Sequence, residues 1–302
     1  MNDRPIAVGV DGSPASVRAA RWAAATAEQR NRPLRLVTAF DWQLGAYIAS
    51  ARHVVPDMDE IMASARELLA EVTVVLRRDH PNLRISDAFV AGVPKDVLVA
   101  ESRDAEMTVL GRRGLGGMAS LLLGSVSTQV TTRGYGPIVV IPDRAESRGP
   151  IVVGVDDSPV GSQETLAFAF EEANWRDAEL VAVHAWTPPG AADLYGRDLG
   201  TDAPPAPAET ELRQLAEALA GWREKYPDLV VRAELAAASP SDALVTHGRD
   251  ARLIVVGAHT RSTVAGVLLG SVSRAVLHRA IGPVAVVRPR QQGGGNGEGT
   301  SG

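Results

Sequence analysis

Cysteine is absent from the 302 residues, so the chain can form neither a disulfide nor a thiolate metal site. The net charge of −5 argues against a nucleic-acid-binding protein that works through a basic surface. No apolar run approaches the roughly 18 residues that a membrane-spanning helix requires. The first residues, MNDRPIAVGVDGS, lack the charged and apolar regions of a signal peptide. We therefore expect a cytoplasmic protein that binds neither nucleic acid nor membrane.

Several catalytic motifs are also missing. The only lysines are Lys95 and Lys225, and both lie outside the glycine-rich segments, so a GxxxxGK[ST] phosphate loop is excluded. The chain has no GxSxG nucleophile elbow and no HxGH signature. The six histidines show no metal-ligand spacing, and we predict a hydrogen-bonded structural role for His184. We expect no catalytic residue, no protein-bound metal site and no rapid enzyme activity, while slow hydrolysis of a bound nucleotide stays open.

The most informative feature that is present is an internal repeat. VGVD at Val8–Asp11 returns at Val153–Asp156, LLLGSVS at Leu121–Ser127 returns as VLLGSVS at Val267–Ser273, and the offset is about 146 residues. A repeat of this length is a duplicated domain rather than a solenoid unit. We predict one domain over residues 1–143 and a second over residues 150–290, joined by a short polar linker. The glycine-rich residues 291–302 are predicted to form a disordered tail.

Short apolar runs alternate with helical patterns in each repeat. In the first repeat, strands are predicted at Ile6–Val10, Leu34–Phe40, Arg84–Val90, Met107–Leu110 and Pro137–Ile141, with helices between them. Alternating strands and helices are typical of a parallel sheet with helices on both faces. The sequence therefore predicts an α/β protein made of two tandem, doubly wound domains, each with five strands.

Two candidate ligand-binding elements fall at strand ends, where open α/β sheets bind their ligands. Asp11 follows the first strand, and Gly111 follows the fourth in the spacing Gly111, two residues, Gly114, nine residues, Gly124, Ser125. Gly124 and Ser125 open the next predicted helix, whose N-terminal N–H groups suit a phosphate. The alternative is that the glycines serve only the turn and Ser125 only caps the helix.

These residues resemble those of the universal stress protein family. The resemblance rests on VGVDGSP at the first strand, the glycine spacing after the fourth, and GPIVVIP at the fifth, and it covers both halves of the chain. It implies five-stranded domains with strand order 3-2-1-4-5 and helices on both faces, usually assembled as dimers. It also implies ATP binding, because family members with this glycine pattern bind ATP, with Mg²⁺ as the expected counterion.

The resemblance assigns site residues in both repeats. In the first, Asp11 is expected near the ribose or the phosphates, Ala39 near the adenine, and the glycine loop around the phosphates. The full expected set is Asp11, Ala39, Gly111, Arg112, Gly114, Gly124, Ser125 and Val126 in the first repeat, and Asp156, Ala185, Gly257, Ala258, Gly270, Ser271 and Val272 in the second.

The second repeat departs from the motif. Thr260 stands where the second glycine belongs, and a β-branched residue tolerates positive φ poorly. Ala258 and His259 replace Arg112 and Arg113, and Asp157 replaces Gly12, which adds a carboxylate near the expected phosphates. We therefore predict that the first site is the stronger. Arg112 and Arg113 are either phosphate contacts or solvated loop charges.

Three functions remain open at this stage. The chain is an ATP-binding regulatory protein of the stress response, a slow ATPase, or an interaction scaffold without nucleotide; we favour the first. The last strand of each domain, PIVVIP and PVAVVRP, is apolar and expected at a sheet edge, so we predict that the two pair as an intramolecular pseudo-dimer. Further homodimerisation stays open. The stretches 41–59 and 187–207 are either flaps over the sites or variable loops.

Overall fold

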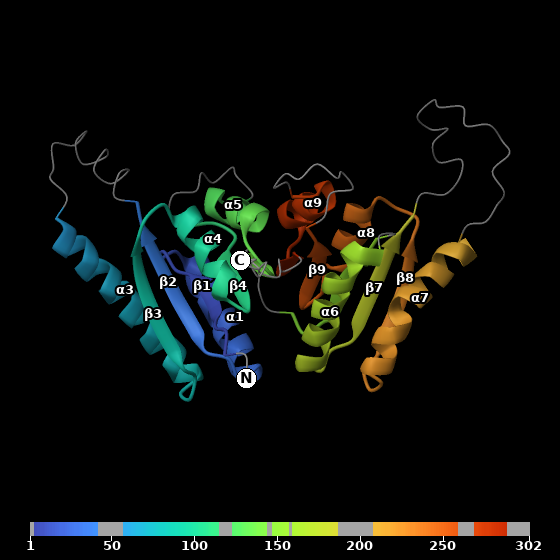
Figure 1. Ribbon diagram of the computed structural model, residues 1–302, viewed down its shortest axis with the longest axis horizontal. Helices are drawn as coiled ribbons and strands as arrows, with labels where there is room; N and C mark the ends of the chain where they lie inside the picture. The colour runs from blue at the N-terminus through green and yellow to red at the C-terminus, as the bar shows by residue number, and fades with distance from the viewer. Residues whose placement is uncertain are drawn as a thin grey trace, which may run out of the picture.

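The computed structural model describes residues 3–41, 57–114, 123–143, 147–156, 159–186, 208–258 and 269–288, without the side chains of 159–162. The two repeats lie side by side, and α3 and α7 form the far ends of the molecule (Figure 1). The elements of the first repeat are β1 (Ile6–Gly9), α1 (Pro14–Gln29), β2 (Leu34–Phe40), α3 (Met58–Asp79), β3 (Ile85–Ala91), α4 (Pro94–Asp104), β4 (Met107–Gly111), α5 (Ser125–Arg133) and β5 (Ile138–Ile141).

The second repeat contains the matching elements in the same order. They are β6 (Ile151–Val155), α6 (Pro159–Trp175), β7 (Leu180–Ala185), α7 (Ala208–Lys225), β8 (Val231–Ala236), α8 (Pro240–His247), β9 (Leu253–Gly257), α9 (Ser271–Arg279) and β10 (Val284–Val287). The five strands predicted for the first repeat agree with the structure to within one residue at their ends.

All ten strands belong to one sheet, in the order β3-β2-β1-β4-β5-β10-β9-β6-β7-β8. Within each half the neighbouring strands are parallel, as β1 is with both β2 and β4. Each half thus has the strand order 3-2-1-4-5, which confirms the predicted α/β class and topology. The reversal of strand order at β1 and β6 places a topological switch point in each half, where ligands bind in such sheets.

The two halves are joined through their last strands. β5 and β10 pair antiparallel, with Val139 opposite Ala285 at the centre of the pair. Both strands are fully apolar and buried, so pairing removes two hydrophobic edges that would otherwise template association with other chains. The predicted intramolecular pseudo-dimer is therefore present.

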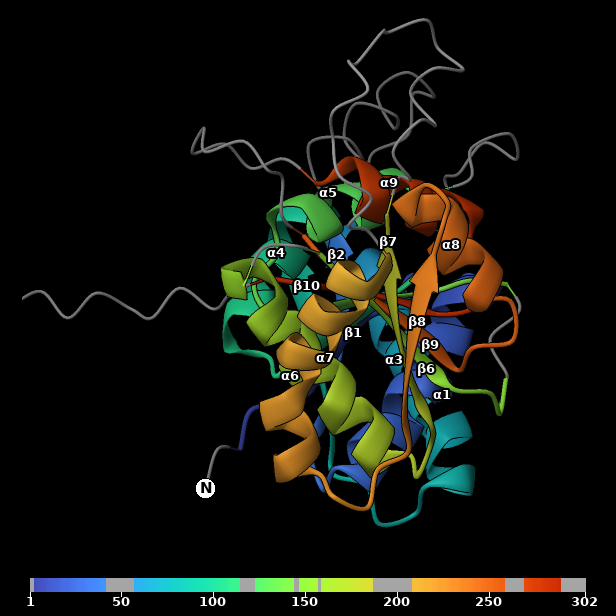
Figure 2. The same cartoon turned by 90° about the vertical axis from the view of Figure 1, so that its right-hand side faces the viewer.

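Helices cover both faces of the sheet, as the sequence predicts. In Figure 2, which faces the second half, α6 and α7 lie on one side of β7 and β8, and α8 lies on the other. One large hydrophobic cluster joins α1 and α3 to α6 and α7 across the two halves. An alanine-rich stripe lets α1 approach the sheet closely, since small side chains keep the backbones near each other; its buried members are Ala19, Ala20, Ala23, Ala24 and Ala27.

Candidate functional site

The first candidate site begins where β1 gives way to α1. Asp11 follows β1, and its carboxylate Oδ1 accepts a hydrogen bond of 3.0 Å from the Ser13 N–H. Gly12 has a φ of +83°, a left-handed conformation that glycine adopts readily. Ser13 then caps α1 by accepting from the Ser16 N–H at 3.1 Å. This tight turn fixes the direction of the Asp11 side chain, and Ser13 is a contributor that the sequence reasoning missed.

The Asp11 carboxylate lies directly against the glycine loop. A Cβ atom added to Gly114 would overlap Asp11 Oδ2, so only glycine fits at this position without displacing the carboxylate. The loop is closed at its other end by the Gly124 N–H, which donates to the Arg112 carbonyl at 2.9 Å. The structure thus brings together Asp11, the segment from Gly111 to Gly114, and Gly124.

A buried serine fastens each glycine loop to its helix. The Ser127 hydroxyl donates to the Gly111 carbonyl at 2.8 Å, and the Ser273 hydroxyl donates to the Gly257 carbonyl at 2.5 Å. The main chain after the fourth strand is also held alike in both halves, since Arg112 N–H donates to Ile141 O and Ala258 N–H to Val287 O. Both residues are the second serine of the repeated GSVS sequence, and this repetition is the sequence feature from which their shared role could have been predicted.

The two helices that follow the glycine loops begin without a side-chain cap. Gly124 and Gly270 are the N-cap residues of α5 and α9, and neither cap residue accepts an N–H through a side chain, as is also the case for α4 with Val93 as its N-cap. By contrast, α1, α3 and α8 are capped by Ser13, Asp57 and Ser239. The first N–H groups of a helix need partners, and an uncapped start with exposed Ser125 or Ser271 suits an anion.

The remaining expected residues lie at the same strand ends. Ala39 is near the end of β2, opposite Val90 of β3, and the first turn of α5 contains Ser125 and Val126. In the second half, Asp156 follows β6, and the other expected residues lie at the ends of β7 and β9 or the start of α9; these are Ala185, Gly257, Ala258, Gly270, Ser271 and Val272. Asp157, His259 and Thr260 lie outside the described residues, as do most of the two flap stretches and the tail.

Arg112 is an expected site residue, but its side chain contacts the other half of the chain. Its guanidinium donates to the carbonyls of Leu277 and Ala280, both at 3.0 Å, and also contacts the carbonyl of His278. These carbonyls belong to the C-terminal end of α9 in the other half. Burial lowers the pKa of this guanidinium and the charge of Arg113 lowers it further, but arginine remains a cation. For nucleotide contact, only the Arg112 main chain is retained as a prediction.

The second half has a polar pair built on a histidine, which Thr38 replaces in the first half. His184 Nδ1 lies 3.0 Å from the Val155 carbonyl, and Nε2 lies 3.0 Å from Glu211 Oε2. His184 is only 6% exposed, and the equivalent position in the first half is Thr38. The predicted structural, hydrogen-bonded role of His184 is confirmed, and its partner Glu211 places a carboxylate near the end of β7.

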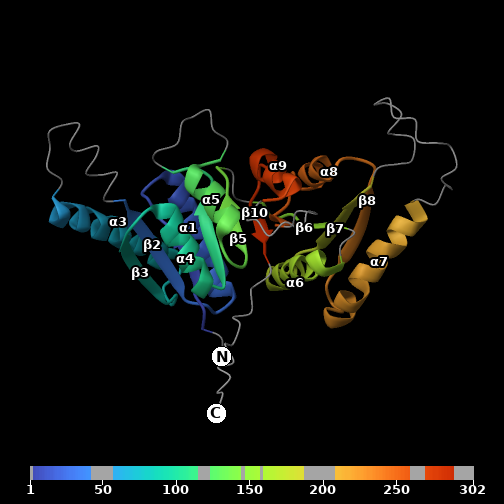
Figure 3. The ribbon, with the colours of Figure 1, turned by 45° about the horizontal axis from the view of Figure 1, so that its top comes forward.

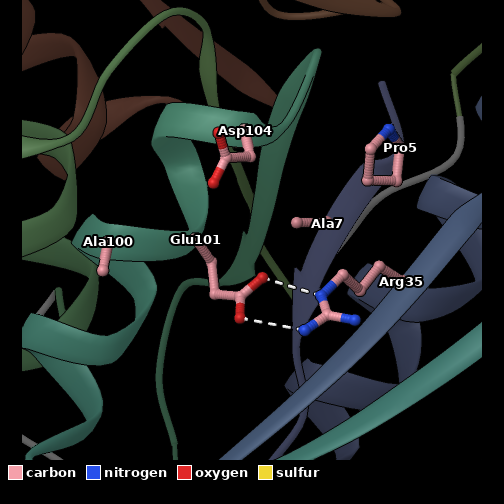
Figure 4. Close-up of a pocket in the computed structure, with 6 residues that line it drawn as sticks. All are labelled: Pro5, Ala7, Arg35, Ala100, Glu101 and Asp104. Carbon is pink, nitrogen blue, oxygen red and sulfur yellow. Dashed lines mark hydrogen bonds and ion pairs between the residues drawn. The ribbon is translucent and has the colours of Figure 1, made fainter. Parts of the chain in front are cut away.

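A separate cavity of about 290 Å³ lies beside the amino-terminal ends of β1 and β2 and the C-terminal end of α4, at the end of these strands away from the glycine loop (Figure 4). Arg35 and Glu101 form a bidentate pair there, with N–O distances of 2.8 and 3.1 Å. Figure 4 shows this pair pointing toward each other beside Ala7. The two charges satisfy one another, so this cavity does not compete with the glycine loop as a ligand site.

The model of the universal stress protein family matches the chain twice, over residues 3–142 and 148–288. The chain belongs to the universal stress protein family. A universal stress protein of Mycobacterium tuberculosis is 40% identical over 296 residues, covering 94% of this chain and 96% of the relative. One from Mycolicibacterium smegmatis is 36% identical over 307 residues, covering 94% and 97%.

A solved structure shows that the fold extends over both halves. The crystal structure of a universal stress protein from Archaeoglobus fulgidus superimposes with a TM-score of 0.69, covering 95% of this chain and 99% of that one. At 18% sequence identity this likeness establishes the fold only. Among the described residues, none of the helices has the length and apolar character needed to cross a bilayer.

Proposed function

We propose that this universal stress protein is an ATP-binding regulatory protein, in which nucleotide occupancy alters conformation or partner choice during stress. The observation that carries the proposal is the cradle in which Gly114 packs against Asp11 while Gly124 closes the loop onto Arg112. The absence of a Cβ at Gly114 keeps the backbone open next to a carboxylate. The uncapped start of α5 supplies N–H donors for phosphate oxygens beside it.

The residues present suit ATP accompanied by Mg²⁺. Mg²⁺ in nucleotide sites is held by one or two carboxylates together with the substrate phosphates, and Asp11 supplies a carboxylate oriented by the Ser13 N–H. Gly111, Gly114 and Gly124 allow the phosphates to approach the backbone, and Ser125 and Val126 lie at the helix start that receives the phosphate tail. Ala39, near the end of β2, is proposed to contact the adenine.

In the second half, we propose a weaker site of the same kind. The start of α9 repeats that of α5, with Gly270 as the N-cap and Ser271 and Val272 in the first turn. Thr260 in place of glycine and the additional carboxylate of Asp157 both disfavour phosphates there. Asp156, Ala185, Gly257 and Ala258 complete the proposed second site.

The proposal is tested by purifying the protein without added nucleotide, denaturing it, and quantifying the adenine nucleotides released per chain. Gly114→Ala and Ser125→Ala should lose the nucleotide, because one adds a Cβ on the Asp11 carboxylate and the other removes a hydroxyl at the helix start. Gly221→Ala is the matched control, since a Cβ there has no neighbour within 4 Å.

The released nucleotide distinguishes the possible outcomes. About one ATP per chain, lost in the two variants but not in the control, supports the first loop as the principal site. About two per chain would contradict the ranking of the two sites, and ADP in place of ATP would favour a slow ATPase. If nothing is released and no ATP binds in the presence of Mg²⁺, the glycine loops are turns and the proposed function is wrong.

A further inference from the structure

Two arginines reach across the junction between the halves to the ends of the phosphate-cradle helices, α5 and α9. Arg112, from the first half, donates to Leu277 O and Ala280 O at 3.0 Å. Arg288, from the second half, donates to Thr131 O of α5 at 3.0 Å through Nη2 and at 3.3 Å through Nε. Thr131 and Leu277 are equivalent positions in the two repeats, so the same turn of each helix receives a guanidinium from the opposite half.

The two arginines themselves are not equivalent. The counterpart of Arg112 in the second half is Ala258, and the counterpart of Arg288 in the first half is Pro142. Each half therefore uses a different position to reach the same point on its neighbour. α5 and α9 lie next to each other above the central strands β5 and β10, which makes both contacts short (Figure 3).

The receiving carbonyls are those that a helix leaves without partners. The last four carbonyls of an α-helix accept no intrahelical bond, and a cation near them also stabilises the helix dipole. Gly134 N–H satisfies Val130 O in α5, and Ala280 N–H satisfies Val276 O in α9, which leaves the following carbonyls to the arginines. Each arginine thus completes the C-terminal cap of a helix in the other half.

Each arginine is also tied to the glycine loop of its own half. The Arg112 carbonyl accepts the Gly124 N–H at the closure of the first loop. Arg288 directly follows Val287, whose carbonyl accepts the Ala258 N–H at the start of the second loop. The first glycine loop is therefore connected to α9 through Arg112 alone. The second glycine loop is connected to α5 through the neighbouring residues Val287 and Arg288.

We infer that Arg112 is a positioning residue for the second nucleotide site and Arg288 for the first, so that each site is completed by the opposite half. α9 has only nine residues, about 13 Å at 1.5 Å per residue. A helix this short moves as a unit, so a displaced C-terminus displaces the N–H groups at its start. The inference rests on the proposed function, since it assumes that both glycine loops hold ATP.

The test measures ATP binding by calorimetry, with Mg²⁺ and the full chain, in two single-site backgrounds. Ser125→Leu fills the start of α5 and leaves the second site; Ser271→Leu fills the start of α9 and leaves the first. Both serines are exposed and occupy the same helix position, so the backgrounds are matched. Arg112→Ala and Arg288→Ala are introduced into each background, with Arg112→Lys as a variant that keeps the charge.

The expected result is a crossed pattern. Arg112→Ala weakens binding at the second site by about 3- to 10-fold and leaves the first site within about 2-fold, whereas Arg288→Ala does the reverse. Arg112→Lys recovers part of the affinity at the second site, because it restores a cation at the end of α9. If the arginines contributed only to general stability, their substitution would lower the melting temperature without selectively weakening the site in the opposite half.

Three results would overturn the inference while leaving the proposed function intact. Arg112→Ala could weaken only the first site, which would make Arg112 a direct phosphate contact. Both variants could weaken both sites equally, which would make the arginines general struts of the junction, or neither could change any affinity. If the unmodified chain binds no ATP, the proposed function fails, and the inference fails with it.

Discussion

The guanidinium of Arg30 lies 2.6 Å from the carboxylate of Glu172, although the two residues belong to different halves of the chain. Both side chains are nearly inaccessible, at 5% and 1% exposure. Glu172 also pairs with Arg176 at 2.6 Å, and Arg30 pairs with Glu106 at 2.8 Å. Glu172 therefore pairs with two buried arginines where α1 meets α6, and Arg30 is shared between Glu172 and Glu106.

We predict that Glu172→Gln destabilises the protein by about 3–5 kcal/mol, because Arg176 loses the buried carboxylate that it pairs with while Arg30 keeps its pair with Glu106. Urea unfolding followed by circular dichroism measures the effect. Asp96→Asn is the control, since Asp96 pairs with Arg133 at 3.0 Å but both side chains are about half exposed. That change should cost about 0.5 kcal/mol or less. Equal losses for the two variants would contradict the prediction.

Glycine-to-alanine substitutions should change the stability of the protein in opposite directions at two positions. A Cβ at Gly111 would lie 2.8 Å from the backbone carbon of Ala15, so Gly111→Ala must push α1 away from β4. We expect a loss of about 1–3 kcal/mol. Gly221 lies at an exposed position within α7, where a Cβ meets nothing. Gly221→Ala should raise stability by about 0.5–1 kcal/mol. The urea unfolding midpoints of the two variants test both predictions. A lower midpoint for Gly221→Ala would contradict the prediction for α7.

The serines of the repeated GSVS segment should differ in what they affect. The buried serines should contribute to stability, and the exposed Ser125 to nucleotide binding. Ser127 is buried and donates to Gly111 O, so Ser127→Ala should cost about 1 kcal/mol. Ser273→Ala should cost a similar amount through the lost bond to Gly257 O. The exposed Ser125 has no such role in the fold, so Ser125→Ala should leave the thermal unfolding midpoint of the nucleotide-free protein unchanged. A large shift in that midpoint would show that Ser125 is needed for folding rather than for binding.

The stability that Asp242 contributes should decrease at acid pH. A hydrogen bond from Ser239 and then the charge and hydrogen bond of Arg279 hold the pKa of this carboxyl below its usual value of 3.8. A lowered folded-state pKa means that the stabilisation is complete above the unfolded value and is lost as the pH falls through the folded one. The difference in urea midpoint between the unmodified protein and Asp242→Asn should therefore shrink below about pH 4. A difference that stays constant from pH 7 to pH 3 would contradict this assignment.

The sequence was sufficient to predict the fold because its signals are local and occur twice. Alternating strand and helix patterns predict the parallel α/β class, and the apolar final strands predict the pairing of β5 with β10. The strand order within each half is what the resemblance to the universal stress protein family implies. The glycine loop was predictable for the same reason, since its members lie at strand ends that a parallel sheet brings to one edge.

The long-range side-chain contacts were not predictable in this way. Arg112 looked like a phosphate contact because it lies within the glycine loop, and its side chain instead reaches carbonyls at Leu277 and Ala280. Which way a long side chain turns depends on what the other half places beside it, and no periodicity encodes that. The same holds for Arg30 and Glu172, whose pairing depends on how α1 and α6 meet across the sheet.

The antiparallel pairing of β5 with β10 also has a consequence for how the molecule behaves at low concentration. Two separate subunits joined by such a pair dissociate on dilution, whereas two halves of one chain remain at a high effective concentration through their short linker. A covalent pair is also free of the symmetry that a homodimer imposes, where every substitution occurs twice. Ala258 stands at the position equivalent to Arg112, and Pro142 at the position equivalent to Arg288; a homodimer of identical subunits could not maintain these differences.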